Sequence, residues 1–318
     1  MIDHPIAVRV AAARDIADDI RLLDLAGEQG GLLPAFAAGA HIDIALPDGM
    51  VRQYSLLNAP GERARYSIAV ARDPAGRGGS IHLHDIIGVG DRLEIGAPRC
   101  HFALIEQASH SVFVAGGIGI TPIWCMIQRL AALGASWELH YAARTRAHAA
   151  LLPEIAAMAA HSGALRTYFN LAGDPLMDLP AIVAAAAPAT QFYACGPGGL
   201  LDAFRAACVA LPPGQVHLEQ FTAAEPAALG GGYVVELAKA KRTIAVAPGQ
   251  TILDALTAAG IRASYSCREG VCGSCETAVL SGTPDHRDAI LTEKERAAGR
   301  TMMICCSGAL SARLVLDL

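Results

Sequence analysis

Hydrophobic and polar residues alternate differently in three parts of the chain, and each pattern predicts a different kind of domain. In residues 1–105, short apolar runs at 40–46, 53–57 and 66–71 are separated by Gly, Pro and Asp. Short runs bounded by turn residues are typical of antiparallel strands. We therefore expect an antiparallel β-barrel in this part of the chain.

The middle of the chain, residues 106–221, alternates strand-like and helix-like segments. The strand-like runs are 111–115, 137–141, 165–169 and 191–195. After the first run, apolar residues recur at the spacing of one helix face, at Ile123, Met126, Ile127 and Leu130. Strands that alternate with helices form parallel sheets, so we expect a parallel α/β domain here.

A non-periodic segment, residues 222–232, ends in three glycines and predicts a linker. Beyond it, residues 233–318 predict a small module that begins with a strand pair at 233–237 and 242–246 and ends with a strand at 313–318. Two capping-box patterns predict short helices between them. Thr251 is followed by Asp254 and later by Gly260, and Thr292 is followed by Glu295 and Gly299.

Composition excludes several classes of protein. Hydrophobic residues make up 53% of the 318 residues, yet we find no uninterrupted apolar run of the length that crosses a membrane. The net charge of −5 and the absence of a basic stripe argue against nucleic-acid binding. The start M-I-D-H-P lacks the basic and apolar regions of a secretion signal. We expect a cytoplasmic, monomeric globular protein.

Four cysteines near the C-terminus have a specific spacing. Cys267, Cys272 and Cys275 follow the pattern C-x4-C-x2-C, and Cys305 comes later. This is the ligand spacing of a plant-type [2Fe–2S] cluster, in which four thiolates hold two irons. Gly270 lets the loop curl around sulfur. The alternative is a zinc site, but zinc motifs usually pair two short C-x2-C units, and this segment has one.

The fourth ligand has two candidates, because Cys305 and Cys306 are neighbours. If both lie in a strand, their side chains point to opposite faces and only one reaches the cluster. The segment 302–305 resembles the closing strand of plant-type ferredoxin modules, where the ligand follows an apolar residue such as Ile304. That resemblance favours Cys305. The other cysteines have no framework spacing, which favours a reducing compartment.

The run R-Q-Y-S-L at residues 52–56 predicts a flavin site. A flavin needs an aromatic face, donors for its ring edge and a cation for its phosphate, which Tyr54, Ser55 and Arg52 supply. The glycine turn 77–80 precedes the apolar run 81–87, which we expect to be a helix whose N-terminus also suits phosphate. The alternative is a surface strand with an ion-paired arginine.

A second glycine motif, G-G-I-G-I-T-P at residues 116–122, lies between an expected strand and an expected helix. It is not the dinucleotide-binding G-x-G-x-x-G. The glycines still allow a diphosphate to approach the backbone at a helix N-terminus, and we expect Thr121 to cap that helix. The alternative is a tight turn that binds nothing.

The R-x-Y-S-L barrel, the G-G-x-G-x-T-P domain and the cysteine motif occur in that order. The whole chain thereby resembles the phthalate dioxygenase reductase family, which includes vanillate demethylase reductases, within the ferredoxin–NADP⁺ reductase superfamily. The resemblance implies FMN instead of FAD, an α/β domain that binds NADH, and a C-terminal ferredoxin domain of the β-grasp type. The flavin contacts that it implies are Arg52, Tyr54, Ser55, Leu56, Gly79 and Ser80. Its nucleotide contacts are Gly116, Gly117, Gly119, Thr121, Cys195, Gly196 and Pro197.

The resemblance also implies roles at the reacting rings. Cys195 and Gly196 would lie beside the nicotinamide, and Phe221 would stack on the flavin and yield to the incoming nucleotide. Glu219 would help to orient the nicotinamide, and Ser55 would face the flavin edge. For Cys195 the alternative is a buried packing residue, and for Glu219 it is a solvated surface carboxylate.

The choice between NADH and NADPH rests on opposing signals. Arg144 and Arg146 follow the expected strand 137–141, where the adenosine ribose should lie, and two arginines suit the 2′-phosphate of NADPH. The family resemblance favours NADH, which we adopt as the expectation.

These features together predict an electron-transfer enzyme. NADH donates two electrons as a hydride and the cluster accepts one, so a flavin must stand between them. The resemblance implies that the acceptor is the Rieske-type centre of a separate aromatic-ring oxygenase or O-demethylase. One alternative is a reductase of the same build that serves a cytochrome P450. Another is an iron–sulfur redox sensor whose flavin site has decayed.

Overall fold

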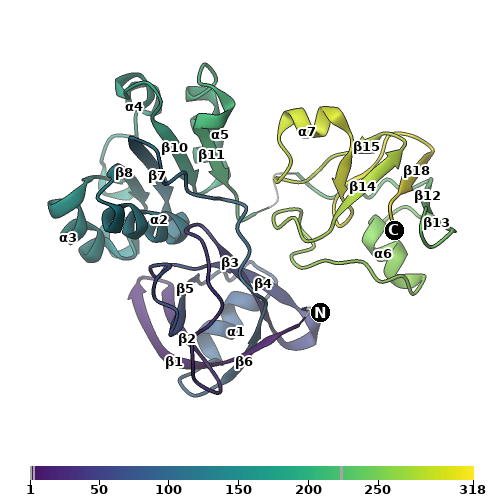
Figure 1. Cartoon of the computed structure of the whole chain (residues 1–318), viewed down its shortest axis with the longest axis horizontal. Helices are drawn as coiled ribbons and strands as arrows, with labels where there is room; N and C mark the ends of the chain where they lie inside the picture. The colour runs from purple at the N-terminus through teal and green to yellow at the C-terminus, as the bar shows by residue number, and fades with distance from the viewer. Residues whose placement is uncertain (1, 3, 223–224) are drawn as a thin grey trace. The chain divides into compact units, whose positions relative to one another are not determined.

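The structure, a computed structural model, describes residues 2, 4–222 and 225–318 and divides into two compact units, Ile2–Glu219 and Gln220–Leu318. The larger unit contains a barrel sheet and a parallel sheet, and the smaller one contains the cysteine motif (Figure 1). Among the described residues, no helix has the length and apolar character that a membrane span requires.

The barrel is an antiparallel sheet of six strands in the order β4-β3-β6-β1-β2-β5. The strands are β1 (Ile6–Ala17), β2 (Ile20–Gly27), β3 (His41–Ala45), β4 (Val51–Ser55), β5 (Arg65–Ala71) and β6 (Arg92–Ile95). A bond from Leu57 N–H to the Ser67 carbonyl (2.9 Å) joins the chain after β4 to β5, the two ends of that order. The helix expected at 81–87 is α1 (Gly79–Asp85), which begins two residues earlier, after Gly78 in the left-handed region (φ 86°).

The second sheet is parallel, with five strands in the order β11-β10-β7-β8-β9. The strands are β7 (His110–Gly116), β8 (Ser136–Ala143), β9 (Ala164–Phe169), β10 (Gln191–Cys195) and β11 (Val216–Glu219). The helices are α2 (Ile120–Leu133), α3 (Leu152–Ser162), α4 (Leu179–Ala185) and α5 (Gly198–Ala207). Buried residues of α2 and α3 form one core with the sheet, and those of α4 and α5 form another, so the sheet is covered on both faces.

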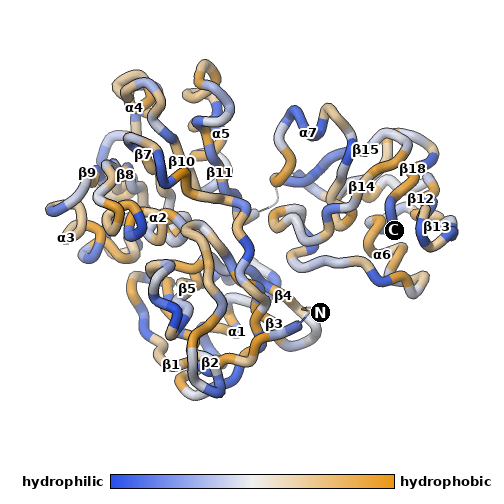
Figure 2. The backbone as a smooth tube through the Cα atoms, in the orientation of Figure 1, coloured by the Kyte–Doolittle hydropathy of each residue, from blue (hydrophilic) through white to orange (hydrophobic). Residues whose placement is uncertain are grey.

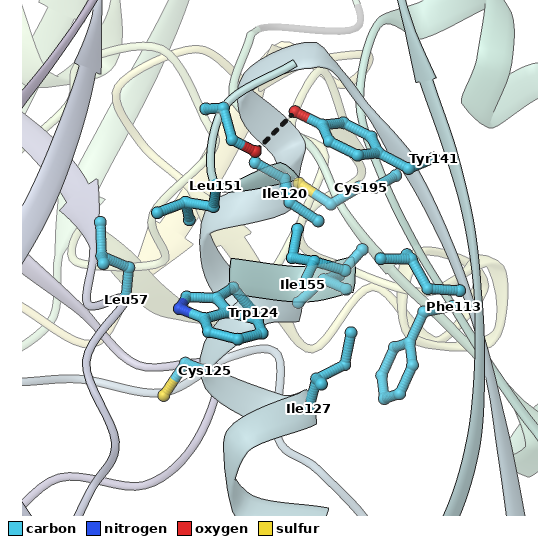
Figure 3. Close-up of a cluster of buried hydrophobic side chains, with 14 of the residues drawn as sticks. Leu57, Phe113, Ile120, Trp124, Cys125, Ile127, Tyr141, Leu151, Ile155 and Cys195 are labelled. Carbon is cyan, nitrogen blue, oxygen red and sulfur yellow. Dashed lines mark hydrogen bonds between the residues drawn. The ribbon is translucent and has the colours of Figure 1, made fainter. Parts of the chain in front are cut away.

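The barrel and the parallel sheet share one core. Ile20 and Leu22 of β2 and Ala69 of β5 belong to the same buried cluster as α2, and Figure 3 shows part of that cluster around Trp124 and Ile127. Gly39 explains the close approach, because a Cβ at this position (φ 91°) would lie 2.7 Å from the Met126 side chain. The two sheets therefore form a single packed body.

The smaller unit is a mixed sheet with the order β13-β12-β18-β14-β16, in which only β12 and β18 are parallel. Its strands are β12 (Tyr233–Leu237), β13 (Arg242–Val246), β14 (Glu276–Ser281), β15 (Pro284–Asp285), β16 (Thr301–Met303), β17 (Gly308–Ala309) and β18 (Arg313–Leu316). Its helices are α6 (Ile252–Ala258) and α7 (Glu293–Ala298), and both predicted capping boxes are confirmed. Apolar α6 packs in the core, whereas α7 buries no residue and is largely blue in Figure 2.

The expected linker 222–232 is partly held by this smaller unit. Ala223 and Ala224 lie outside the described residues. Ala228 N–H donates to the Cys306 carbonyl (2.8 Å), the Leu229 carbonyl accepts from Gly249 N–H (2.8 Å), and Glu225 pairs with Arg287 (2.8 Å). The segment from residue 225 onward is therefore attached to the cysteine-bearing unit.

Candidate functional site

The four cysteines of the C-x4-C-x2-C…C pattern are buried and their thiols form one connected group. The Cys267 thiol contacts those of Cys272 and Cys305, and the Cys275 thiol contacts that of Cys305. Within the described ranges, no three His, Cys, Asp or Glu side chains converge as the ligands of one metal ion. Four neighbouring thiols with this spacing match the four thiolate ligands of a [2Fe–2S] cluster.

Crowding makes these thiols hard to ionise without a metal. Contact with Cys305, followed by burial, raises the pKa of the Cys275 thiol far above its usual range, and contact with Cys267, followed by burial, raises that of Cys272. Bound cations would reverse this preference, because metal ligation favours the thiolate. Backbone N–H groups already point at sulfur, from Glu269 to Cys267 (3.3 Å) and from Ser274 to Cys272 (3.4 Å).

The thiols of Cys305 and Cys306 have different neighbours, but the reason is not the alternation of side chains along a strand. Strand β16 ends at Met303, and both cysteines lie in the following turn, which the Met303 carbonyl closes by accepting from Cys306 N–H (3.2 Å). The condition that both lie in a strand is therefore not met, and alternation along a strand does not separate them. The Cys305 thiol contacts Cys275, whereas the Cys306 sulfur lies near the Met303 carbonyl (3.8 Å) and Ser307 Oγ (3.9 Å).

In the barrel, Arg52 and Tyr54 lie on the same side of β4, next to the turn that starts α1. A Cβ on Gly79 would lie 2.8 Å from Arg52 Cγ, so only glycine lets the helix start lie this close to the arginine. Burial raises the pKa of Tyr54 to about 12, against a smaller opposing effect of Arg52. An arginine and a tyrosine at a helix start are the groups that a flavin phosphate and ring would use.

The other predicted flavin contacts differ in how available they are. Ser55 Oγ is buried and, among the described residues, has no hydrogen-bond partner, which leaves it free for a ligand atom after a rotamer change. Leu56 is fully buried in the barrel core, so its side chain packs there instead of facing a ligand. The Ser80 hydroxyl accepts from Asp73 N–H (3.0 Å) and thus holds its own loop.

The glycine motif brings the ends of β7 and β10 close together. A Cβ on Gly116 would lie 2.7 Å from Pro197 Cδ, and one on Gly196 would lie 3.0 Å from Gly116 Cα. A Cβ on Gly119 would lie only 2.2 Å from the Cys195 carbonyl oxygen, while Gly117 (φ 53°) has open space beside it. Backbone that is open at the start of a 14-residue helix is suited to a diphosphate.

Thr121 does not cap that helix as we expected. Helix α2 begins at Ile120 with Gly119 as its N-cap, and no side chain caps it. The Thr121 hydroxyl is buried and donates to the Ile118 carbonyl (3.0 Å). The prediction failed because the 3-10 turn Gly117–Gly119 leads directly into α2, so the N-cap lies two residues before Thr121.

Cys195 and Glu219 are paired neighbours at the ends of β10 and β11. Cys195 is fully buried beside Ile120 and Tyr141 (Figure 3), and burial, with the Glu219 carboxylate, raises the pKa of its thiol well above the usual value. Glu219 is half-buried as a residue, but its Oε2 atom is inaccessible and, within the described ranges, unpaired. Burial raises the pKa of this carboxyl to about 8.

Phe221 follows two residues after Glu219, in the smaller compact unit, and its side chain is 37% exposed. Its stacking on a flavin stays a prediction.

Sequence reasoning missed the residues of α2 that hold the chain just after the R-x-Y-S-L motif. Gln128 donates to the Leu57 carbonyl (2.7 Å) and the Cys125 thiol to the Asn58 carbonyl (3.2 Å). Their only sequence signal was their place on a helix.

Known proteins are similar to this chain both in its cysteine-bearing part and over nearly its whole length. The family model described as a 2Fe-2S iron-sulfur cluster binding domain matches residues 235–310. Phenoxybenzoate dioxygenase subunit beta of Ectopseudomonas oleovorans is 56% identical over 99% of this chain and 98% of its own. Vanillate O-demethylase oxidoreductase of Pseudomonas sp. (strain HR199 / DSM 7063) is 43% identical over 98% of this chain and all of its own (100%).

Two solved structures also match nearly the whole chain. Phthalate dioxygenase reductase, described as a modular structure for electron transfer from pyridine nucleotides to [2Fe–2S], is 38% identical with a TM-score of 0.75, over 99% of this chain and 98% of its own. An intact type IV self-sufficient cytochrome P450 monooxygenase is 42% identical with a TM-score of 0.88, over 99% of this chain but 41% of its own.

Proposed function

The chain belongs to the phthalate dioxygenase reductase family, and we propose that it carries electrons from NADH through FMN and a [2Fe–2S] cluster to a separate Rieske-type oxygenase. The observation that carries this proposal is the connected group of four buried thiols in the same chain as an open glycine turn at the start of α2. A redox sensor without substrate would not need that turn. The free cysteines support a reducing, cytoplasmic setting.

Each part of the chain has a binding task in this proposal. Cys267, Cys272, Cys275 and Cys305 hold the cluster, with backbone N–H groups that offset charge on sulfur. Arg52 binds the FMN phosphate at the start of α1, and Tyr54 packs against the ring. A flavin held there would supply the chemistry that converts a two-electron hydride donor into a source of single electrons.

The nucleotide site positions its substrate without acid–base chemistry. The open backbone at Gly117 receives the diphosphate, and Gly196 leaves room for the nicotinamide at the end of β10. Cys195 shapes the floor of that site as a neutral thiol, because its raised pKa excludes a reactive thiolate. Burial raises the pKa of Glu219 to about 8, which favours the protonated carboxyl, a group that is able to donate a hydrogen bond.

A second acceptor class has one observation in its favour. A self-sufficient cytochrome P450 monooxygenase matches 99% of this chain at 42% identity, and the match covers 41% of that protein's own chain. A reductase with the same three-part fold can therefore be part of a haem enzyme. We rank the oxygenase first because phenoxybenzoate dioxygenase subunit beta, a relative of the same length, is more similar in sequence (56% identical).

Rapid mixing of the purified protein with NADH tests the proposal. We expect the flavin absorbance to bleach no later than the cluster absorbance. The Cys275→Ser variant should still reduce ferricyanide with NADH but should no longer support a Rieske-type oxygenase. Full oxygenase turnover by this variant would mean that the cluster is not the exit for electrons.

A further inference from the structure

The adenosine end of the nucleotide site is defined by the order of the parallel strands. The glycine turn that suits the diphosphate follows β7, and Gly196, which suits the nicotinamide, follows β10 on one side. A dinucleotide that extends across the carboxyl edge of the sheet must therefore place its adenosine on the other side, after β8 and β9. The residues there are 144–148 and 170–174.

Two exposed arginines lie at the end of β8. Arg144 is the first residue after the strand, and Arg146 begins the short 3-10 turn Arg146–His148. In the part of the chain that the structure describes, neither guanidinium forms an ion pair or a side-chain hydrogen bond. Two unpaired guanidinium groups at one strand end form a site suited to a phosphate dianion.

The acidic residue that would favour NADH is missing from this strand end. An NADH site uses a carboxylate to bind the ribose 2′-hydroxyl, but residues 142–148 read A-A-R-T-R-A-H. The Thr145 hydroxyl is engaged with His148 Nδ1 (2.8 Å). The nearest carboxylate on the loop after β9, that of Asp174, accepts from Phe169 N–H (2.9 Å) and does not pair with either arginine.

The loop after β9 adds an apolar surface next to the arginines. Leu171 N–H donates to the Arg144 carbonyl (3.0 Å), and the loop is closed by the Asp174 bond to Phe169. The Leu171 side chain is 72% exposed although its backbone is held in place. An exposed aliphatic side chain on this loop offers apolar surface against which an adenine ring can pack.

We propose that Arg144 and Arg146 bind a 2′-phosphate on the adenosine ribose, so that NADPH is a substrate of this reductase in addition to NADH. The inference rests on the proposed function, because it concerns the same nucleotide site. The hydride leaves the nicotinamide ring as it does from NADH. NADPH, oxidised flavin and one proton from solvent would give NADP⁺ and two-electron-reduced flavin.

Steady-state kinetics with three electron donors tests this. For the wild type we expect kcat/KM for NADPH to be within about tenfold of that for NADH. Arg144→Gln and Arg146→Gln should each lower kcat/KM for NADPH by about ten- to a hundredfold, the effect of one charge-assisted contact, mainly through KM. For NADH the same variants should change kcat/KM by less than about threefold. Reduced nicotinamide mononucleotide, which has no adenosine, should react equally with every variant.

A binding measurement separates the phosphate from catalysis. In calorimetry, adenosine 2′,5′-bisphosphate should bind the holoprotein at least about tenfold more tightly than 5′-ADP, and Arg144→Gln should remove that preference. Arg205→Gln, on the exposed face of α5, is the matched control and should change neither affinity.

The outcomes distinguish this inference from the proposed function. If NADH reduces the protein but NADPH is at least about a thousandfold less efficient, the inference is wrong and the proposed function stands. If the two variants lower kcat/KM equally for NADH and NADPH, the arginines do not bind the 2′-phosphate. If neither nucleotide reduces the flavin, the proposed function fails as well.

Discussion

Gly270 lies directly against the thiol of Cys306, since a Cβ built on this glycine would come within 2.5 Å of Cys306 Sγ. The same Cβ would lie 3.0 Å from Asp288 Cα, and Gly270 has a positive φ of 71°. The loop between Cys267 and Cys272 is therefore held between two later segments of the chain, and Cys306 packs behind it instead of facing the cluster.

The first prediction concerns the fourth ligand. Cys305→Ser should lose the cluster, because its thiol is the one that contacts Cys275 and Cys267. Cys306→Ser is the matched control and should keep about two irons per chain and a rhombic EPR signal after dithionite reduction. A cluster retained in Cys305→Ser and lost in Cys306→Ser would reverse the assignment.

The second prediction concerns Gly270. Gly270→Ala should lower the free energy of unfolding of the cysteine-bearing unit by at least about 1–2 kcal/mol for the left-handed backbone alone, and should lower iron content through the clash with Cys306. Gly299→Ala is the control, because its φ is also positive (60°) but its Cβ would be 3.8 Å from its nearest neighbour. Equal iron content in both variants would show that the contact with Cys306 is unimportant.

The third prediction concerns the flavin phosphate. Arg52→Ala should weaken FMN binding by about ten- to a hundredfold, because it removes a charge-assisted contact worth roughly 1.5–3 kcal/mol. Flavin released by heat from the wild type should be FMN on chromatography. Arg92→Ala, an exposed arginine on β6, should leave the affinity unchanged. Undiminished FMN affinity in Arg52→Ala would place the phosphate elsewhere.

The fourth prediction concerns Glu219 and pH. Its folded-state pKa of about 8 is above the ordinary value of 4.5, so between these values the folded chain holds a proton that the unfolded chain releases. The stability of the fold that depends on the protonated Glu219 carboxyl is fully present below pH 4.5. It is lost as the pH rises to about 8. In urea unfolding of the wild type from pH 5 to 9, the free energy of unfolding should fall more steeply with pH than in Glu219→Gln. Identical pH slopes would mean that Glu219 ionises normally.

The sequence alone determined the features that depend on residues close together in the chain. The cysteine spacing, the strand Gln191–Cys195 and the capping boxes at Thr251 and Thr292 were all predictable, because each is set within a few residues. The three-part fold class was predictable for the same reason. Each part has its own hydrophobic period, and that period fixes the type of secondary structure.

Only the tertiary structure decided how distant segments meet. It showed that Cys305 and Cys306 lie in a turn, that Gly119 instead of Thr121 is the N-cap of α2, and that half-buried Glu219 lies beside Cys195. Burial and electrostatic environment depend on neighbours far along the chain, and a pattern of nearby residues carries no information about them. The ligands were therefore visible in the sequence, while the charge states around them required the fold.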